Sequence, residues 1–311
     1  MKLKNKLLLL TTLIASTHIQ AEEESIVGSR SFLFSENNNK VIELQSANAN
    51  YKTPGDVSID FYGHMAFRIT SPKGLTMMLD PWRNDPTGVF GVWYPHDFPE
   101  VAVDIAMSSH AHFDHDALYQ TRATMNLERM AGEFELGDVK ITGVADKHQC
   151  QAPGEINWTK YLKDQFGLDL EDLCPDKSSM SWDNIIYIIE TGGLKIGFWG
   201  DNRPEPSDFA SKHLQNLDIL IMNIDGSGHI LSYEQVGDIL NRYKPKTVIP
   251  GHYLTNGVAL RASTLKPANE WVANQAHSKT LNSPTMTFNQ AVIKDAPEGM
   301  VFYFADNYKT D

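Results

Sequence analysis

Four potential metal ligands lie within six residues in the segment from Ser109 to His115, whose sequence is SHAHFDH. The chain holds 11 His among 311 residues, so composition alone does not predict three His and an Asp this close together. A mostly apolar run of strand length, residues 103–109, ends directly before His110. The end of a strand can aim closely spaced side chains at one point, and His nitrogen and carboxylate oxygen suit zinc, manganese or iron. The segment therefore predicts a metal site, with a polar loop of chance histidines as the alternative.

The His-x-His-x-Asp-His string resembles the signature of the metallo-β-lactamase superfamily. That resemblance implies an αββα sandwich with the metal site at the edge of the two sheets. It also implies a third His after a later strand, which His148 supplies, and an Asp after another strand, which Asp201 supplies behind Gly200. A final His at the end of a strand near the C-terminus is supplied by His252. The order and spacing of these residues cover roughly residues 57–255.

Two further motifs are similar to one branch of that superfamily. Gly63-His64 followed by MAFRI, and then LTMMLDPW, resemble the ascorbate-6-phosphate lactonase type and related metal-dependent hydrolases. N-acyl phosphatidylethanolamine phospholipase D is a more distant likeness. The zinc β-lactamases lack the complete Asp-His pair that is used together with His252, so the resemblance argues against antibiotic hydrolysis.

The resemblance also implies how the ligands are shared between two divalent metal ions. One ion would be held by His110, His112 and His148, the other by Asp114, His115 and His252, and Asp201 would bridge them. Each ion then has three residues and the shared carboxylate, which leaves a place for water or hydroxide. Two such cations lower the pKa of that water and clamp the attacking and leaving oxygens. Zinc is the expected metal, while manganese and iron stay open.

The predicted activity is hydrolysis of a small ester or lactone by a metal-bridging hydroxide. Asp201 would position this hydroxide and accept its proton. The preference for an ester or lactone rests on the lactonase resemblance alone.

Other residues are candidates for supporting roles. His64, after a strand and a glycine, could act on the substrate or brace the metal site, with plain turn chemistry as the alternative. His229, in DGSGHI, is a candidate general acid or an ordinary surface histidine. Asp80 could orient a metal-bound His or serve only a turn, and Tyr253 could stabilise an oxyanion or only pack. The aromatic loop of residues 82–94, with Trp82, Trp93 and Tyr94, could wall a substrate pocket or belong to the core.

Three other functions are compatible with the same ligand set. A phosphodiesterase, including one acting on lipids, is the second candidate, although the net charge of −12 counts against polyanionic substrates. A metal-dependent oxidoreductase would bind iron and take up oxygen, since geometry and availability select the metal. A non-catalytic binding protein would be fully loaded with metal and turn nothing over, and the intact set of ligands argues against it. The sequence leaves the oligomeric state open.

The first 21 residues have the three-part form of a cleavable secretory signal peptide. Three Lys precede the apolar residues 7–15, and Ala21 is a small residue before a plausible cut. The apolar run is shorter than the roughly 20 residues that a membrane helix needs, so a stable membrane anchor is not expected. An uncleaved anchor is the alternative. A periplasmic or secreted protein is predicted.

The surface charge favours a small-molecule substrate over nucleic acid. Without the three Lys of the signal peptide, 24 basic residues stand against 39 acidic ones. Such a surface repels phosphate backbones, so nucleic acid is not an expected partner.

Residues 55–311 are predicted to form one α/β domain with sheet packed on sheet and helices outside. Residues 22–54 are expected to be a loosely ordered polar leader, and 149–183 an insertion over the mouth of the site. Cys150 and Cys174 of this insertion could form a disulfide in an oxidising compartment or stay free. Period-two alternation or apolar runs predict strands, and period-3.6 patterns predict helices. The predicted strands are three within 57–80 and others at 103–109, 139–145, 184–190, 194–200, 217–224, 246–251, 285–293 and 299–305; the predicted helices are 114–127, 232–243 and 268–281.

Overall fold

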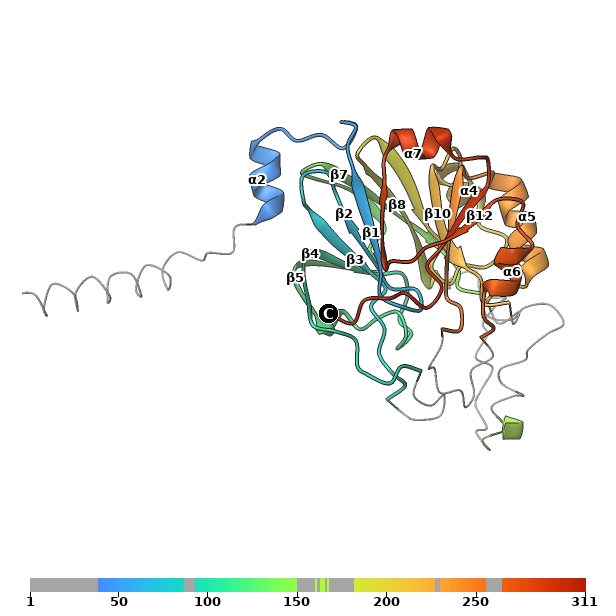
Figure 1. The fold of residues 1–311 in the computed structure, drawn as a ribbon. Helices are drawn as coiled ribbons and strands as arrows, with labels where there is room; N and C mark the ends of the chain where they lie inside the picture. Colours follow the sequence, from blue (N-terminus) through green and yellow to red (C-terminus); the bar gives the residue numbers. More distant parts are fainter. Residues whose placement is uncertain are drawn as a thin grey trace, which may run out of the picture. The chain divides into compact units, whose positions relative to one another are not determined.

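The computed structural model describes residues 39–86, 93–149, 160, 163–165, 167, 182–226, 230–255 and 265–311. The predicted signal peptide, most of the predicted insertion with Cys150 and Cys174, and His229 lie outside these residues. Within residues 40–311 the described strands form two sheets (Figure 1).

The first sheet combines the strands that follow the polar leader with one strand from near the C-terminus. Its order is β13-β1-β2-β3-β4-β5. The strands β1, β2 and β3 pair antiparallel, as predicted for a meander, while β3, β4 and β5 run parallel. The strands are β1 (Val57–Phe61), β2 (Phe67–Thr70), β3 (Thr76–Leu79), β4 (Val101–Ser108), β5 (Thr121–Glu128) and β13 (Thr285–Phe288).

The second sheet has the order β12-β14-β11-β10-β9-β8-β7-β6. Its strands β6 to β9 pair antiparallel, and β9, β10, β11, β14 and β12 are parallel. Every residue of β10 and β11 is buried, as expected for parallel strands that are covered on both faces. The strands are β6 (Gly132–Leu136), β7 (Val139–Asp146), β8 (Asn184–Thr191), β9 (Leu194–Phe198), β10 (Ile219–Asn223), β11 (Thr247–Gly251), β12 (Ser278–Thr280) and β14 (Met300–Tyr303).

The longest described helix, α5, begins where the sequence predicts. Ser232 caps it, accepting a hydrogen bond from the Gln235 backbone while the Gln235 side chain accepts from the backbone N–H of Ser232. In Figure 1, α5 and α6 lie beyond the strands of the second sheet. Among the described residues, no helix is long and apolar enough to cross a membrane. The helices are α2 (Lys40–Ser46), α4 (Asp208–His213), α5 (Tyr233–Tyr243), α6 (Asn269–Ala273), α7 (Gln290–Asp295) and the 3-10 helix η1 (Leu118–Gln120).

The main hydrophobic core joins side chains of both sheets. Ile59 and Phe67 of the first sheet belong to the same buried cluster as Ile141, Ile196 and Phe198 of the second. Full burial of each such side chain stabilises the fold by about 1.5–3 kcal/mol. The layered α/β sandwich predicted from the sequence is therefore confirmed.

The helix predicted at 114–127 is wrong. Its second half is the strand β5, which pairs parallel with β4. In TRATMNLE the alternate residues Thr121, Ala123, Met125 and Leu127 are more buried than their neighbours, which is the period-two pattern of a strand. The pairing with β4 outweighs the helical propensity of Ala, Met and Leu.

Three further segments differ from the prediction. Of the helix predicted at 268–281, only α6 is helical, and the strand β12 follows it. The strand predicted at 285–293 ends at Phe288, because the Asn289 side chain accepts a hydrogen bond from the Val292 backbone and begins α7. The polar leader contains α2, whose Val41 and Leu44 are buried.

Candidate metal centre

The predicted ligands follow the C-terminal ends of strands in both sheets. The segment 110–115 follows β4, while His148, Asp201 and His252 follow β7, β9 and β11. The strands β7, β9 and β11 point in the same direction, so their ends share one edge of the second sheet. The two sheets meet at this edge, where the backbone N–H of His252 donates to the carbonyl of His64 at 2.8 Å.

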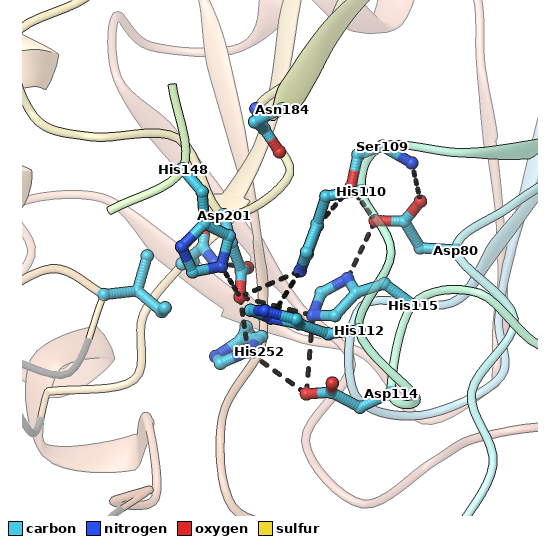
Figure 2. A network of polar contacts seen from close by, with 12 residues as sticks. Asp80, Ser109, His110, His112, Asp114, His115, His148, Asn184, Asp201 and His252 are labelled. Atoms are coloured by element: carbon cyan, nitrogen blue, oxygen red, sulfur yellow. Dashed lines mark hydrogen bonds and ion pairs between the residues drawn. The ribbon is translucent and has the colours of Figure 1, made fainter. Parts of the chain in front are cut away.

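One carboxylate oxygen lies at the centre of the ligands. The Nε2 atoms of His115 and His252 are each 3.3 Å from Asp201 Oδ2, and those of His148 and His110 are 3.5 and 3.8 Å from it. Figure 2 shows these imidazoles converging on Asp201. The segments that carry them are far apart in the sequence, so the fold itself assembles this centre.

Around this oxygen the remaining candidate ligands lie near one another in two groups, and a third group, Asp80, His110 and His115, links them. The potential ligand atoms of His110, His112 and His148 lie within 4.8 Å of one another, with His110 Nε2 and His112 Nδ1 3.1 Å apart. In the second group, Asp114 Oδ2 lies 3.5 Å from His115 Nε2 and 3.9 Å from His252 Nε2. The same 4.8 Å limit also includes His64 in the second group.

The hydrogen-bonding state of the imidazoles fits metal ions. The Nε2 atoms of His115, His148 and His252 are buried and have no hydrogen-bond partner among the residues that the structure describes. Each lies 3.3–3.5 Å from Asp201 Oδ2, longer than the usual N–H···O distance of about 2.7–3.2 Å. An unsatisfied buried polar atom costs about 1–3 kcal/mol. Several such atoms around one carboxylate therefore indicate that a bound metal ion satisfies them. Imidazole nitrogen with carboxylate oxygen is a donor set for zinc, manganese or iron.

The charges around the centre also favour cations. Burial raises the pKa of Asp201, but the surrounding imidazoles, His115 first, hold that pKa well below its ordinary value. Burial lowers the pKa of His115, but the Asp201 and Asp114 carboxylates raise it well above the ordinary range. Burial lowers the pKa of His110 well below its ordinary value. The protein thus gathers ionised carboxylates and places at least one positive charge between them, a position that a metal ion can take in exchange for the proton.

Asp80 supports two ligands from behind, and it contacts a predicted metal-binding His as the sequence suggests. Its Oδ2 accepts a hydrogen bond from His115 Nδ1 at 2.8 Å, which leaves His115 Nε2 to face the centre. The same oxygen accepts from Ser109 Oγ at 2.6 Å, and Oδ1 accepts from Ser109 N at 2.6 Å. Ser109 Oγ lies 3.0 Å from His110 Nδ1 and so can accept from it in turn. Asp80 is fully buried and has a φ of 44°, a conformation that non-glycine residues rarely adopt.

Asn223 is a contact of the centre that the sequence analysis missed. Its Nδ2 donates to Asp201 Oδ1, which leaves Oδ2 to face the imidazoles. Its signal in the sequence is an amide that ends the otherwise apolar run ILIM. Gly200, just before Asp201, has a φ of 60°, and a Cβ there would lie 2.7 Å from the Ser109 Cβ. The turn therefore requires glycine where it passes the β4 end.

The sequence of this chain matches a known protein family. A family model described as "Beta-lactamase superfamily domain" matches residues 58–252, which run from β1 to the last predicted ligand. The chain belongs to the metallo-β-lactamase superfamily.

Two relatives within this superfamily are named UPF0173 metal-dependent hydrolases. One, from Anaeromyxobacter dehalogenans, is 30% identical over 217 residues, covering 65% of this chain and 76% of that protein. Another, from Thermodesulfovibrio yellowstonii, is 30% identical over 95 residues, so the matched part spans only 35% of that relative. A solved structure from Thermotoga maritima, described as a Zn-dependent hydrolase of the metallo-β-lactamase superfamily, has a TM-score of 0.53 at 18% identity. The superposition covers 79% of this chain and 97% of the Thermotoga maritima chain, and it shows that the two share a fold.

The remaining residues that the sequence analysis singled out are Tyr253, the aromatic loop of residues 82–94 and His229. Tyr253 is buried, and its hydroxyl donates to the Ala305 carbonyl at 2.7 Å, so the packing alternative holds and the oxyanion role is wrong. Trp82 and Tyr94 stack with ring centroids 3.9 Å apart in the second hydrophobic cluster. Among the described residues, Trp93 alone of these aromatic residues packs against a site histidine, His64, with ring centroids 4.9 Å apart. The predicted general acid His229 lies outside the described residues.

Proposed function

We propose that this chain is a two-metal hydrolase in which Asp201 bridges the ions. The first ion would be held by His110, His112 and His148, and the second by Asp114, His115 and His252. The observation that carries the proposal is the position of Asp201 Oδ2, which faces four imidazole nitrogens at 3.3–3.8 Å. The proposed reaction class is also supported by the names of the relatives, which are metal-dependent hydrolases.

The protein's own contribution is to fix the donor atoms before substrate arrives. Asn223 holds one oxygen of Asp201, so the other is directed to both groups of imidazoles. Asp80 sets the His115 tautomer by accepting the proton on Nδ1. Bound divalent ions would lower the pKa of a water and polarise the bond under attack. Asp201, already at the centre, is the carboxylate that we assign to position this water.

We propose zinc as the metal and a small ester or lactone as the substrate. Phe113 lies between two ligands in the sequence and packs edge-on against Trp93, with ring centroids 5.4 Å apart. Apolar rings beside the second group suit an uncharged group next to the scissile bond. The net charge of −12 works against polyanionic substrates, so a phosphodiester is the second choice.

We also propose that the protein is exported to the periplasm or beyond. This proposal is supported by the signal-peptide pattern of residues 1–21. Cell fractionation with mass determination of the mature N-terminus tests it. Recovery of the intact chain in the cytoplasm would contradict it.

The activity is tested with protein that has been stripped of metal and reloaded with zinc, manganese or iron. Each form is assayed against lactones, carboxylic esters, a chromogenic phosphodiester and a β-lactam. We expect hydrolysis of an ester or lactone that is lost with chelator and restored by metal. His112→Ala should be inactive, whereas His213→Ala, altered on α4, should behave as the wild type.

The other outcomes refute specific parts of the proposal. Turnover of phosphodiesters alone would replace the substrate class. Oxygen uptake by the iron form would indicate an oxidoreductase. Full metal occupancy without turnover on any substrate would indicate a binding protein.

A further inference from the structure

Among the described residues, His64 contacts the second group of ligands and not the first. Its ring is 99% buried, and its centroid lies 4.2 Å from that of His252 and 5.2 Å from that of His115. Its Nε2 lies 3.0 Å from Asp114 Oδ2. His64 therefore touches all three residues that the proposed function assigns to the second ion, and the inference rests on that assignment.

The distances separate His64 from the metal-binding imidazoles. Asp114 Oδ2 lies 3.5 and 3.9 Å from the Nε2 atoms of His115 and His252, which is too long for a hydrogen bond. Its 3.0 Å distance to His64 Nε2 is an ordinary N–H···O hydrogen bond. Within the described part of the chain, the Nε2 atoms of His115 and His252 also lack a hydrogen-bond partner, whereas that of His64 has one. His64 thus has the contacts of a hydrogen-bond donor, and His115 and His252 have those of metal ligands.

The backbone at His64 is held in an unusual conformation that aims this donor. Its φ is 53°, in the left-handed region, and such conformations cost about 1–3 kcal/mol, so they persist only where surrounding contacts offset that cost. The carbonyl of His64 accepts from the His252 backbone at 2.8 Å. Trp93 packs on the imidazole with ring centroids 4.9 Å apart. The turn between β1 and β2 is therefore tied directly to the strand end that carries a ligand.

We propose that His64 is a positioning residue for the second ion only. It donates its Nε2–H to Asp114 and so holds the carboxylate in the orientation that binds metal. Ligand supports of this kind typically change metal affinity by about 10–100-fold. The first ion has a separate support in the contact of Ser109 with His110, so the loss of His64 should affect the two ions unequally.

A matched pair of variants tests the proposal. His64→Asn keeps an amide donor and tolerates the left-handed conformation, but its side chain is too short to reach Asp114. His64→Gln has the same amide on a side chain that is one methylene longer than Asn, so its NH2 group can lie close to the former position of the imidazole Nε2. We expect His64→Asn to bind one ion normally and the second about 10–100-fold more weakly. His64→Gln should recover most of that affinity. The control is His96→Ala, because in the described part of the chain the His96 ring packs against Trp82 and Tyr94 and not against a ligand, and it should match the wild type.

The readouts are titration with zinc against a competing chelator, the absorption bands of the cobalt-substituted proteins, and thermal melting as a check of folding. His64→Gln should have the same cobalt spectrum as the wild type. If neither variant recovers the second ion and both alter the cobalt bands, His64 is a direct ligand and the proposal is wrong. Equal affinity of all variants for both ions would also overturn it. If the wild type itself binds fewer than two ions, the proposed function fails instead, so the two failures are distinguishable.

Discussion

Replacement of Asp80 by Asn should weaken metal binding without changing any ligand. The carboxylate accepts three hydrogen bonds, from Ser109 N, Ser109 Oγ and His115 Nδ1. Asn has the same shape but only one acceptor oxygen, so its NH2 group must face a donor in either orientation. If the NH2 faces His115, it favours the tautomer with the proton on Nε2, which cannot bind metal. If it faces Ser109, the backbone N–H there loses its acceptor.

The magnitude follows from these contacts. Loss of a support behind a metal-binding His lowers affinity about 10–100-fold, which is about 1.4–2.7 kcal/mol. A buried donor left without an acceptor costs about 1–3 kcal/mol of unfolding free energy. Asp80→Asn should therefore show both a weaker metal affinity and a less stable metal-free state.

The assay compares two buried carboxylates. Asp138 is also buried and accepts from Ser71 Oγ at 2.8 Å and Lys73 N at 2.9 Å, in a turn away from the ligands. Zinc affinity is measured by competition with a chromophoric chelator, and stability by denaturant unfolding of the metal-free proteins. Asp80→Asn should lower both quantities, and Asp138→Asn only stability. Equal zinc affinity in the two variants would refute the role assigned to Asp80.

Three other perturbations have expected outcomes. Removing metal with chelator should lower the melting temperature, and metal restored at 100 times its Kd should add about 2.7 kcal/mol of stability; an unchanged melting curve would contradict this. Burial lowers the pKa of His64 to about 3 and that of His110 well below its ordinary value, so the unfolded chain protonates first as pH falls through about 6.5. Each ring should then cost the metal-free protein up to about 1.4 kcal/mol per pH unit, so stability should fall between roughly pH 6 and 5. In this range the carboxylates of Asp114 and Asp201, whose pKa values are lowered, are ionised in both the folded and the unfolded chain, while Asp80, whose pKa burial raises, acts in the opposite direction. Denaturation at several pH values checks the fall in stability, and a flat profile refutes it. Gly200→Ala should cost more than about 1 kcal/mol, measured by denaturant unfolding, because its φ is 60° and its Cβ would meet Ser109 at 2.7 Å; near-native stability would be evidence against a strained turn.

One segment of the candidate ligands could be predicted from a local signal. In the segment from His110 to His115 the residue types alone indicate a metal site, whereas His148, Asp201 and His252 were assigned from the family resemblance. The strands of the meander were predictable for the same reason, since alternation directly reflects burial. The family resemblance supplied the pairing of these distant segments, which spacing alone does not determine.

The sequence indicated His64 and Asp80 as candidate supports, but the partners of the supporting residues could not be predicted in the same way. Asn223 bonds Asp201 across 22 positions, and His64 bonds Asp114 across 50. Such contacts depend on which strand ends meet, and no local pattern encodes that. The strand β5 was missed because its residues have mixed propensities and its conformation is decided by pairing with β4.

The most direct test of the account is the metal content of Asp201→Ala. Metal per folded chain is measured by elemental analysis beside turnover of the best substrate, with circular dichroism as the check of folding. The wild type should hold two ions, and the variant should fall towards one with its turnover lost, because the shared carboxylate belongs to both sites. An Asp201→Ala protein that keeps two ions and near-normal turnover would contradict the bridged two-metal centre.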